Sequence, residues 1–156
     1  MTSPASLSIR STPFEHPDAV ELRAAQRREL DVRYGGDTEP GIKPTAADMS
    51  EFVIAYDETS GEALGCGGLR MLDDGTAELK RMFVVQHARG SGVSTAILRE
   101  LEARAMKQGC TTLRLETGTA QPDAVRFYER EGYVRTANFG AYAGIERSLC
   151  YARQLA

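Results

Sequence analysis

A short turn in the middle of the chain has the residue types and spacing of a phosphate-binding site. Its sequence is Arg89-Gly90-Ser91-Gly92, and a long helical pattern follows it. Gly90 and Gly92 lack the Cβ atoms that would keep a ligand away from the backbone. The start of a helix directs several unpaired N–H groups and about half a positive charge toward such a ligand. Because Arg89 adds a permanent cation, the turn predicts a site for a phosphate or pyrophosphate.

Two elements have to position this turn. A strand over Ala77–Val85 precedes it, and a helix follows it and ends at Gly109. The apolar positions of the helix recur at helical spacing and are Val93, Ala96, Ile97, Leu101 and Ala105. Alternation along the strand predicts one face formed by Glu78, Lys80, Met82 and Val84. Charges on a central strand indicate that part of it lines a wet cleft, because buried unpaired charge is unfavourable.

The remaining patterns predict one mixed α/β (α+β) domain over residues 1–156. Three strands joined by tight turns form an antiparallel N-terminal half, and the strand Thr112–Glu116 lies parallel to Ala77–Val85. Glycines within the strand 62–72 indicate a bulge or a close backbone approach. The other expected strands are Leu7–Thr12, Phe52–Tyr56, Glu62–Leu72, Tyr133–Thr136 and Arg147–Arg153, and the other expected helices are Ala19–Tyr34, a short turn at Thr45–Asp48, and Asp123–Glu131. The sum is a sheet of six to seven strands with about four helices.

Composition narrows the class of protein. A net charge of −3 and a pI near 5.5, without a run of lysine or arginine, argue against nucleic-acid binding as the main role. Cys66, Cys110 and Cys150 stand far apart and are expected to be reduced thiols without a catalytic role. Two histidines without ligand-like spacing predict no metal site. The absence of a leader pattern and of a membrane-span pattern predicts a cytoplasmic protein that does not act at a membrane.

A dinucleotide-binding fold is an alternative for the same turn. Its fingerprint is a strand, a glycine-rich turn, a helix and a second strand that ends in an acidic residue. The chain matches this outline with Gly90-x-Gly92 and Glu116. However, Thr95 stands where the third glycine belongs, and the glycines lie several residues beyond the strand. Only about forty residues follow Glu116, too few for the remaining βαβ units. A P-loop is excluded because no Gly-Lys-Ser/Thr follows the turn.

Two motifs resemble those of the GNAT superfamily of acetyl-CoA-dependent N-acetyltransferases. The first, Gln/Arg-x-x-Gly-x-Gly/Ala, is matched from Arg89 onward, with Ser94 in place of the last small residue. The second, Asn-x-x-Ala-x-x-x-Tyr-x-x-x-Gly-Phe/Tyr, is matched by residues 121–133, with Gln121 in the asparagine position. Both motifs occur in the order and spacing of the family, and the resemblance covers most of the chain. It implies the GNAT fold.

The resemblance also implies how acetyl-CoA binds. Backbone groups of Met82, Phe83 and Val84 would contact its acetyl and pantetheine part. Its pyrophosphate would be bound by the turn and the first residues of the helix, namely Arg89, Gly90, Ser91, Gly92, Val93 and Ser94. Gln121 stands where the family has an asparagine that hydrogen-bonds the cofactor.

Acetyl transfer to an amine needs a base for the amine and a proton for the departing thiolate. Amines and tyrosine have reference pKa values near ~10 and a thiol near ~8.5, so a carboxylate acting through water can serve as base and a tyrosine as acid. Glu78 aligns with the frequent glutamate base of the family, and Glu116 is the second candidate. Tyr128 matches the common general acid. The structural alternatives are an ion-paired Glu78 and a half-buried core Tyr128.

These features predict an enzyme that moves acetyl from acetyl-CoA to a primary amine of a small molecule or peptide by direct attack. The alternative is a non-catalytic acyl-CoA sensor or partner-binding module. Residues 27–37 and 139–144 are expected to select the acceptor. The first of these segments contains acidic and aromatic residues that could attract a cationic amine or form a solvated surface. These residues are Glu29, Asp31, Tyr34 and Asp37. Homodimers through the C-terminal strands are common in such folds, and the sequence leaves this assembly open.

Overall fold

A seven-stranded mixed sheet forms the centre of the molecule in the computed structural model, which describes residues 6–36, 43–73 and 75–155. The strand order is β1-β2-β3-β4-β5-β7-β6, and all neighbours are antiparallel except β4 and β5. The strands are β1 (Leu7–Ser11), β2 (Met49–Asp57), β3 (Ala63–Met71), β4 (Thr76–Val84), β5 (Thr112–Gly118), β6 (Val134–Thr136) and β7 (Ser148–Gln154). The predicted mixed sheet, with its antiparallel N-terminal half and parallel central pair, is confirmed.

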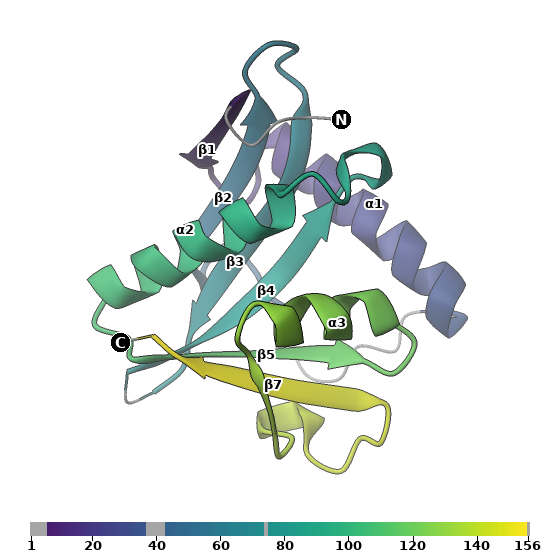
Figure 1. Ribbon diagram of the computed structural model, residues 1–156, viewed down its shortest axis with the longest axis vertical. Helices are drawn as coiled ribbons and strands as arrows, with labels where there is room; N and C mark the ends of the chain where they lie inside the picture. Colours follow the sequence, from purple (N-terminus) through teal and green to yellow (C-terminus); the bar gives the residue numbers. More distant parts are fainter. Residues whose placement is uncertain (1–5, 37–42, 74, 156) are drawn as a thin grey trace.

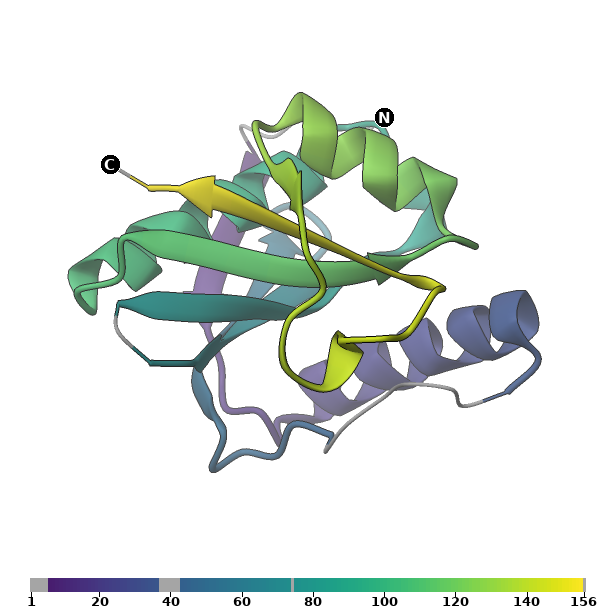
Figure 2. The ribbon, with the colours of Figure 1, turned by 90° about the horizontal axis from the view of Figure 1, so that it is seen from below.

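Helices cover both faces of this sheet. Helices α2 (Val93–Lys107) and α3 (Pro122–Arg130) lie on one face, and α1 (Pro17–Tyr34) lies on the other (Figures 1 and 2). These are the three α-helices among the described residues, where about four helices were expected. The segment at 45–48 is a turn, because the Asp48 carboxylate accepts from Thr45 N at 3.1 Å and closes it before β2 begins.

Glycines in β3 let α2 pack directly against the sheet. A Cβ on Gly65 would lie 3.0 Å from Ile97 Cδ1, and one on Gly67 would lie 2.8 Å from Leu101 Cδ1. Both of these α2 side chains are fully buried. The predicted close backbone approach within this strand is therefore confirmed, and its partner is the apolar face of α2.

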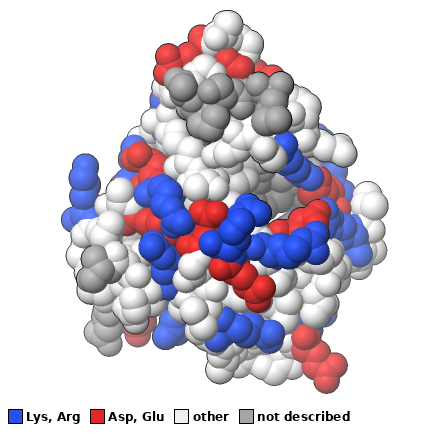
Figure 3. Space-filling view, in the orientation of Figure 1, with Lys and Arg blue, Asp and Glu red and all other residues white. Residues whose placement is uncertain are grey.

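A buried acidic residue connects α2 to the C-terminal half. Glu102 accepts a hydrogen bond from the Tyr133 hydroxyl at 2.7 Å and from Arg99 at 2.8 Å. Arg99 also reaches Glu131, just after α3, at 2.8 Å. Basic and acidic side chains are interspersed over this face of the molecule (Figure 3). Because hydrogen bonds and cations satisfy the buried carboxylate, the cluster positions the end of α3 relative to α2.

The parallel pair β4–β5 is short, and the two strands separate beyond it. Only three residues of each strand pair, ending at Glu78 and Arg114. Beyond this point β4 carries an extra residue relative to β3, and Arg81 takes a φ of +61°. It is the one non-glycine residue with positive φ in the described part of the chain. A bulge interrupts the alternation of a strand and redirects its side chains, which places the second half of β4 beside a gap in the sheet.

Candidate active site

The glycine turn has the backbone conformation that its sequence predicts. Gly90 and Gly92 take φ values of +78° and +93°, which favour glycine. Gly92 is the N-cap of α2, and within the described residues no side chain caps this helix end. The first N–H groups of α2 therefore lack an intrahelical partner and point toward the adjoining surface.

A groove of about 600 Å³ lies against this helix end and is called here the α2 groove. It contains eight of the ten residues expected to bind acetyl-CoA: Met82, Phe83, Val84, Arg89, Gly90, Gly92, Ser94 and Gln121. The other two point elsewhere. Ser91 is buried and donates its hydroxyl hydrogen to Ala88 O at 2.5 Å, and the Val93 side chain lies in the core. These two residues offer a ligand their backbone rather than their side chains.

Arg89 is held at the edge of the α2 groove by two contacts. Its Nε donates to Val84 O at 2.8 Å, and its Nη2 donates to Glu29 Oε1 of α1 at 2.8 Å. The guanidinium thus has one hydrogen bond to the end of β4 and one ion pair to a partly exposed carboxylate. An anion in the groove would compete with Glu29 for this cation.

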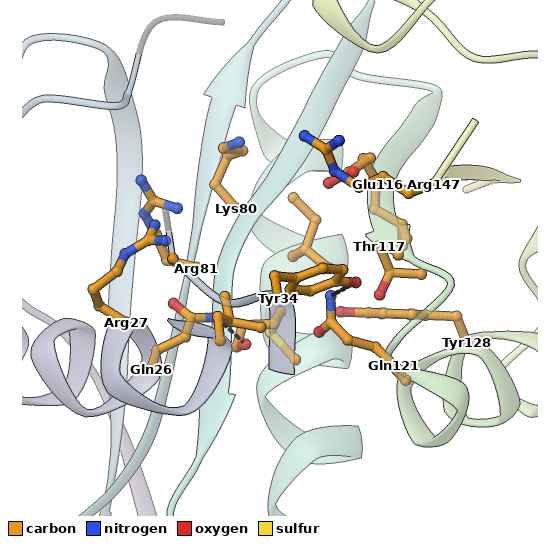
Figure 4. A pocket seen from close by; sticks show the side chains of 17 residues that line it. Gln26, Arg27, Tyr34, Lys80, Arg81, Glu116, Thr117, Gln121, Tyr128 and Arg147 are labelled. Atoms are coloured by element: carbon orange, nitrogen blue, oxygen red, sulfur yellow. Dashed lines mark hydrogen bonds between the residues drawn. The ribbon is translucent and has the colours of Figure 1, made fainter. Parts of the chain in front are cut away.

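A second, smaller cavity lies where β4 and β5 separate, and we call it the β4–β5 cleft. Its volume is about 150 Å³. Residues 79–82 of β4 and 115–118 of β5 line two of its walls, and α1 contributes Gln26, Arg27, Leu30 and Tyr34 (Figure 4). Four consecutive β4 residues line it because the bulge at Arg81 breaks the alternation that the sequence analysis assumed.

The α2 groove and the β4–β5 cleft meet. Six residues line both cavities: Gln26, Leu30, Met82, Gln121, Ala124 and Tyr128. The Tyr128 ring is buried, with edge-to-face contacts to Phe127 and Tyr133, and its hydroxyl points toward the junction (Figure 4). Burial raises the pKa of this hydroxyl, and no group among the described residues is hydrogen-bonded to it. Tyr128 therefore presents a protonated hydroxyl where two cavities join.

The two candidate bases occupy different environments. Glu116 of β5 lines the β4–β5 cleft and accepts a hydrogen bond from Ser148 Oγ at 2.8 Å. Glu78 is 3% exposed and does not belong to the walls of either cavity. Of the two carboxylates, Glu116 is the one that lines the β4–β5 cleft, which meets the α2 groove at Tyr128.

Glu78 lies in a buried cluster beside the β4–β5 cleft. Its Oε2 accepts from the Tyr142 hydroxyl at 2.7 Å and lies 3.8 Å from Lys80 Nζ, while Oε1 lies 3.8 Å from Arg70 Nη1. Lys80 Nζ in turn donates to the Tyr142 hydroxyl at 3.0 Å. This is the ion-paired environment that the sequence analysis gave as the alternative for Glu78. The segment 139–144, expected to contact the acceptor, contributes Tyr142 to this cluster.

Gln26 of α1 was not predicted as a site residue, and the contacts that Tyr34, one of the expected acceptor-selecting residues, makes were not predicted either. Gln26 Nε2 donates to Met82 O at 2.8 Å, which ties the helix to the strand at the junction of the cavities. The Tyr34 hydroxyl accepts from Gln121 Nε2 at 3.2 Å. A Cβ on Gly118 would lie 1.9 Å from this hydroxyl, so Tyr34 packs directly on the β5 backbone. No local sequence pattern marks these contacts, since each joins residues far apart in the chain.

Other potential functional groups lie away from the cavities. All three cysteines are buried, and burial raises the pKa of the Cys66 thiol to about 12. A thiol with such a pKa stays protonated near neutral pH and is a poor nucleophile. Within the described ranges, no cluster of His, Cys, Asp or Glu is suited to a metal ion, and no helix is long and apolar enough to span a membrane. Asp37 lies outside the described residues.

Comparisons with known proteins agree with this geometry. The model of the Acetyltransferase (GNAT) family matches residues 15–133. An IAA acetyltransferase from Azospirillum brasilense is 33% identical over 135 residues, covering 81% of this chain and 86% of that protein. A Klebsiella pneumoniae protein assigned as an acyl-CoA N-acyltransferase has a similar structure, with a TM-score of 0.84, 26% identity, and coverage of 97% of this chain and 99% of that one.

A further solved structure shares the fold at lower identity. It is a GNAT family acetyltransferase from Elizabethkingia anophelis with acetyl-CoA bound, with a TM-score of 0.69 and 18% identity. The similarity covers 96% of this chain and 98% of that one.

Proposed function

Because the chain belongs to the Acetyltransferase (GNAT) family, we propose that it transfers an acetyl group from acetyl-CoA to a primary amine by direct attack. One observation carries this proposal. The α2 groove and the β4–β5 cleft are separate cavities that meet at Tyr128, so two substrates can approach one point from different sides. Holding two reactants in this way is a large part of what catalysis of a bimolecular reaction requires.

The chemistry of the α2 groove supports acetyl-CoA as its ligand. The uncapped start of α2 and Arg89 would bind the diphosphate, and the backbone of β4 from Met82 to Val84 would lie along the pantetheine arm. The Met82 and Val84 carbonyls accept hydrogen bonds from Gln26 and Arg89, and a carbonyl oxygen can accept a second hydrogen bond from a ligand. When bound, acetyl-CoA supplies an acetyl thioester.

We assign the proton transfers to Glu116 and Tyr128, which both line the cleft. Glu116 accepts a proton from the acceptor amine through a water molecule, and Tyr128 donates one to the departing thiolate. The raised pKa of Tyr128 keeps its hydroxyl protonated, as a general acid requires. The earlier assignment of Glu78 as base stays a prediction. Its burial beside Lys80 and Tyr142 supports a positioning role for Glu78.

The burial of the three cysteines supports direct transfer of the acetyl group to the amine without an acyl-enzyme. An acyl-enzyme would need an accessible thiolate, whereas Cys66, Cys110 and Cys150 are buried with raised pKa values. The acceptor amine would therefore attack the thioester itself. Cytoplasmic location and homodimer formation remain predictions from the sequence.

The test is release of free CoA from acetyl-CoA across a panel of primary amines, with acetyl-CoA binding followed separately by calorimetry. The proposed enzyme releases CoA only when an acceptor is present. A protein that binds acetyl-CoA but releases no CoA with any amine would instead be the acyl-CoA sensor or partner-binding module.

A further inference from the structure

Cationic side chains predominate around the β4–β5 cleft. Four of them line it, from α1, β4 and the segment before β7: Arg27, Lys80, Arg81 and Arg147. Glu116 is the one acidic residue among the described residues that line the same cleft. A cavity with this charge attracts anions and disfavours a second cation.

The same charge continues into a neighbouring cavity at the start of α1. This cavity, of about 340 Å³, shares Arg27 and Arg81 with the cleft and adds Arg23, Lys43 and Glu15. Figure 4 shows Arg27 and Arg81 at the same end of the cleft. Around both cavities there are six cations: Arg23, Arg27, Lys43, Lys80, Arg81 and Arg147. Two acidic residues, Glu15 and Glu116, are among the described residues that line the two cavities, and the ion pairs of Arg27 with Asp31 and of Lys80 with Glu78 lie beside them. Cations therefore outnumber acidic side chains among the described lining residues.

Two details indicate that these cations form an anion-binding site. Arg81 projects from the one described non-glycine position with positive φ, a conformation that disfavours a long side chain. Burial lowers the pKa of Arg23, Glu15 and Cys66 oppose this, and the positive charge of Arg81 adds a smaller lowering effect. Both the backbone strain and the crowding of like charges would be offset by an anion bound between the arginines.

The acidic residues of α1 that were expected to attract a cationic amine do not line the β4–β5 cleft. Glu29 lines the α2 groove and pairs with Arg89 there. Asp31 lies 3.7 Å from Arg27 Nη1 and does not line the cleft. Of the described residues expected to select a cationic acceptor, only Tyr34 lines the cleft.

We propose that the acceptor is a primary amine that also carries a carboxylate, and that Arg27 and Arg81 bind this carboxylate. This inference rests on the proposed transferase function. The carboxylate would lie at the arginine end of the cleft, while the amine would face Glu116 on β5 and the junction at Tyr128 (Figure 4). The planar guanidinium groups suit a carboxylate because each can donate two parallel hydrogen bonds.

Matched pairs of amines test the proposal. Each pair contains an amino acid and the amine left when its carboxylate is removed: phenylalanine with phenethylamine, lysine with cadaverine, and β-alanine with ethylamine. CoA release gives kcat/KM for both members, with wild type and with Arg27→Gln, Arg27→Lys and Arg28→Gln. Arg28 is the matched control, because it is the next residue of α1, is exposed, and pairs with Glu21 outside the cavities.

In at least one pair, we expect the carboxylated member to be preferred by about tenfold or more, the value of one charge-assisted hydrogen bond. Arg27→Gln should abolish this preference, chiefly through KM. Arg27→Lys should retain part of it, and Arg28→Gln all of it. Equal effects of Arg27→Gln and Arg28→Gln would overturn the assignment of Arg27.

The outcomes separate this inference from the function on which it rests. If CoA is released but the uncarboxylated member is used as well or better in every pair, the inference is wrong and the transferase stands. If acetyl-CoA binds but no amine releases CoA, the transferase proposal fails and the inference fails with it.

Discussion

The side-chain amide of Gln121 donates a hydrogen bond to the Tyr34 hydroxyl at 3.2 Å, joining the N-cap of α3 to the last residue of α1. A parallel contact lies beside it, since Arg33 Nη1 donates to Ala120 O at 3.1 Å. These two hydrogen bonds connect α1 to the loop between β5 and α3, on either side of the β4–β5 cleft. The width of the cleft at this end therefore depends on side chains of α1.

Gly118 should be essential for the position of Tyr34. A Cβ at this position would lie 1.9 Å from the Tyr34 hydroxyl, so Gly118→Ala must displace the ring. We expect the KM for the amine to rise about tenfold, as for other displaced positioning groups, with little change in acetyl-CoA affinity. Initial rates at varied amine concentration measure this effect. The double variant Gly118→Ala/Tyr34→Ala should regain stability because it removes the clash, and an unchanged KM in Gly118→Ala would refute the assigned role.

Tyr128→Phe should lower kcat by about 100-fold, within the range for loss of a general acid, without weakening acetyl-CoA binding. Tyr133→Phe is the matched control, because Tyr133 is another buried tyrosine in contact with Tyr128 and donates to Glu102 instead of facing the cavities. It should cost about 1.5–3 kcal/mol of unfolding free energy, because the lost hydrogen bond goes to a buried carboxylate, and should leave kcat near the wild-type value. Equal kcat in Tyr128→Phe and wild type would show that the Tyr128 hydroxyl is idle.

The pH dependence of kcat/KM should show an acidic limb without an alkaline limb up to about pH 10. A general acid is active while protonated, and burial raises the pKa of Tyr128 above its reference value of ~10, so this proton is lost only at still higher pH. The base must be deprotonated, so activity is lost as the pH falls. Initial rates measured up to about pH 10 in buffers with overlapping ranges give the pH profile of kcat/KM.

Glutamine substitutions then identify the base. Glu116→Gln should lower kcat strongly and remove the part of the acidic limb that belongs to this carboxylate. Glu78→Gln should keep the limb and lower thermal stability, because it removes the charge that pairs with Lys80 and Arg70. Loss of the limb in Glu78→Gln alone would assign the base to Glu78 instead.

Glu29→Gln should strengthen acetyl-CoA binding about two- to fivefold, the size expected when a partly exposed competing ion pair is removed. The reason is that Glu29 holds the Arg89 guanidinium at 2.8 Å, where a diphosphate would also bind. Glu21→Gln on the same helix is the control, since Glu21 pairs with Arg28 away from the α2 groove. Weaker binding by Glu29→Gln would mean that Glu29 orients Arg89 rather than competing for it.

Features encoded in short stretches could be predicted from the sequence. Gly90 and Gly92 predict a turn before a helix, and the spacing of one motif identifies Tyr128 as a candidate site residue. The fold class follows from the same local periodicities, which distinguish strands from helices. The short helical turn expected at 45–48 is a simple turn in the structure. Four residues show that the chain turns, but the kind of turn depends on side-chain contacts such as that between Thr45 N and the Asp48 carboxylate.

Contacts between distant segments could not be predicted. Gln26 reaches the Met82 carbonyl although nothing near it in the sequence marks it for the site. Tyr34 was expected near the acceptor, but its packing on Gly118 was not. The base is a similar case. Strict alternation treats Glu78 as part of the cleft-facing face of β4, whereas β4 still pairs with β5 at Glu78 and the cleft opens only beyond it, around the bulge at Arg81. Bulges depend on how neighbouring strands pair, which a single strand's pattern does not encode.

The central claim is that the start of α2 and Arg89 bind the diphosphate of acetyl-CoA. Calorimetric titration of acetyl-CoA into the wild-type protein and into Arg89→Gln tests it most directly. We predict one binding site per chain, with affinity reduced about tenfold or more in the variant through loss of a charge-assisted hydrogen bond. Absence of binding to the wild-type protein, or equal affinity in the two proteins, would contradict it.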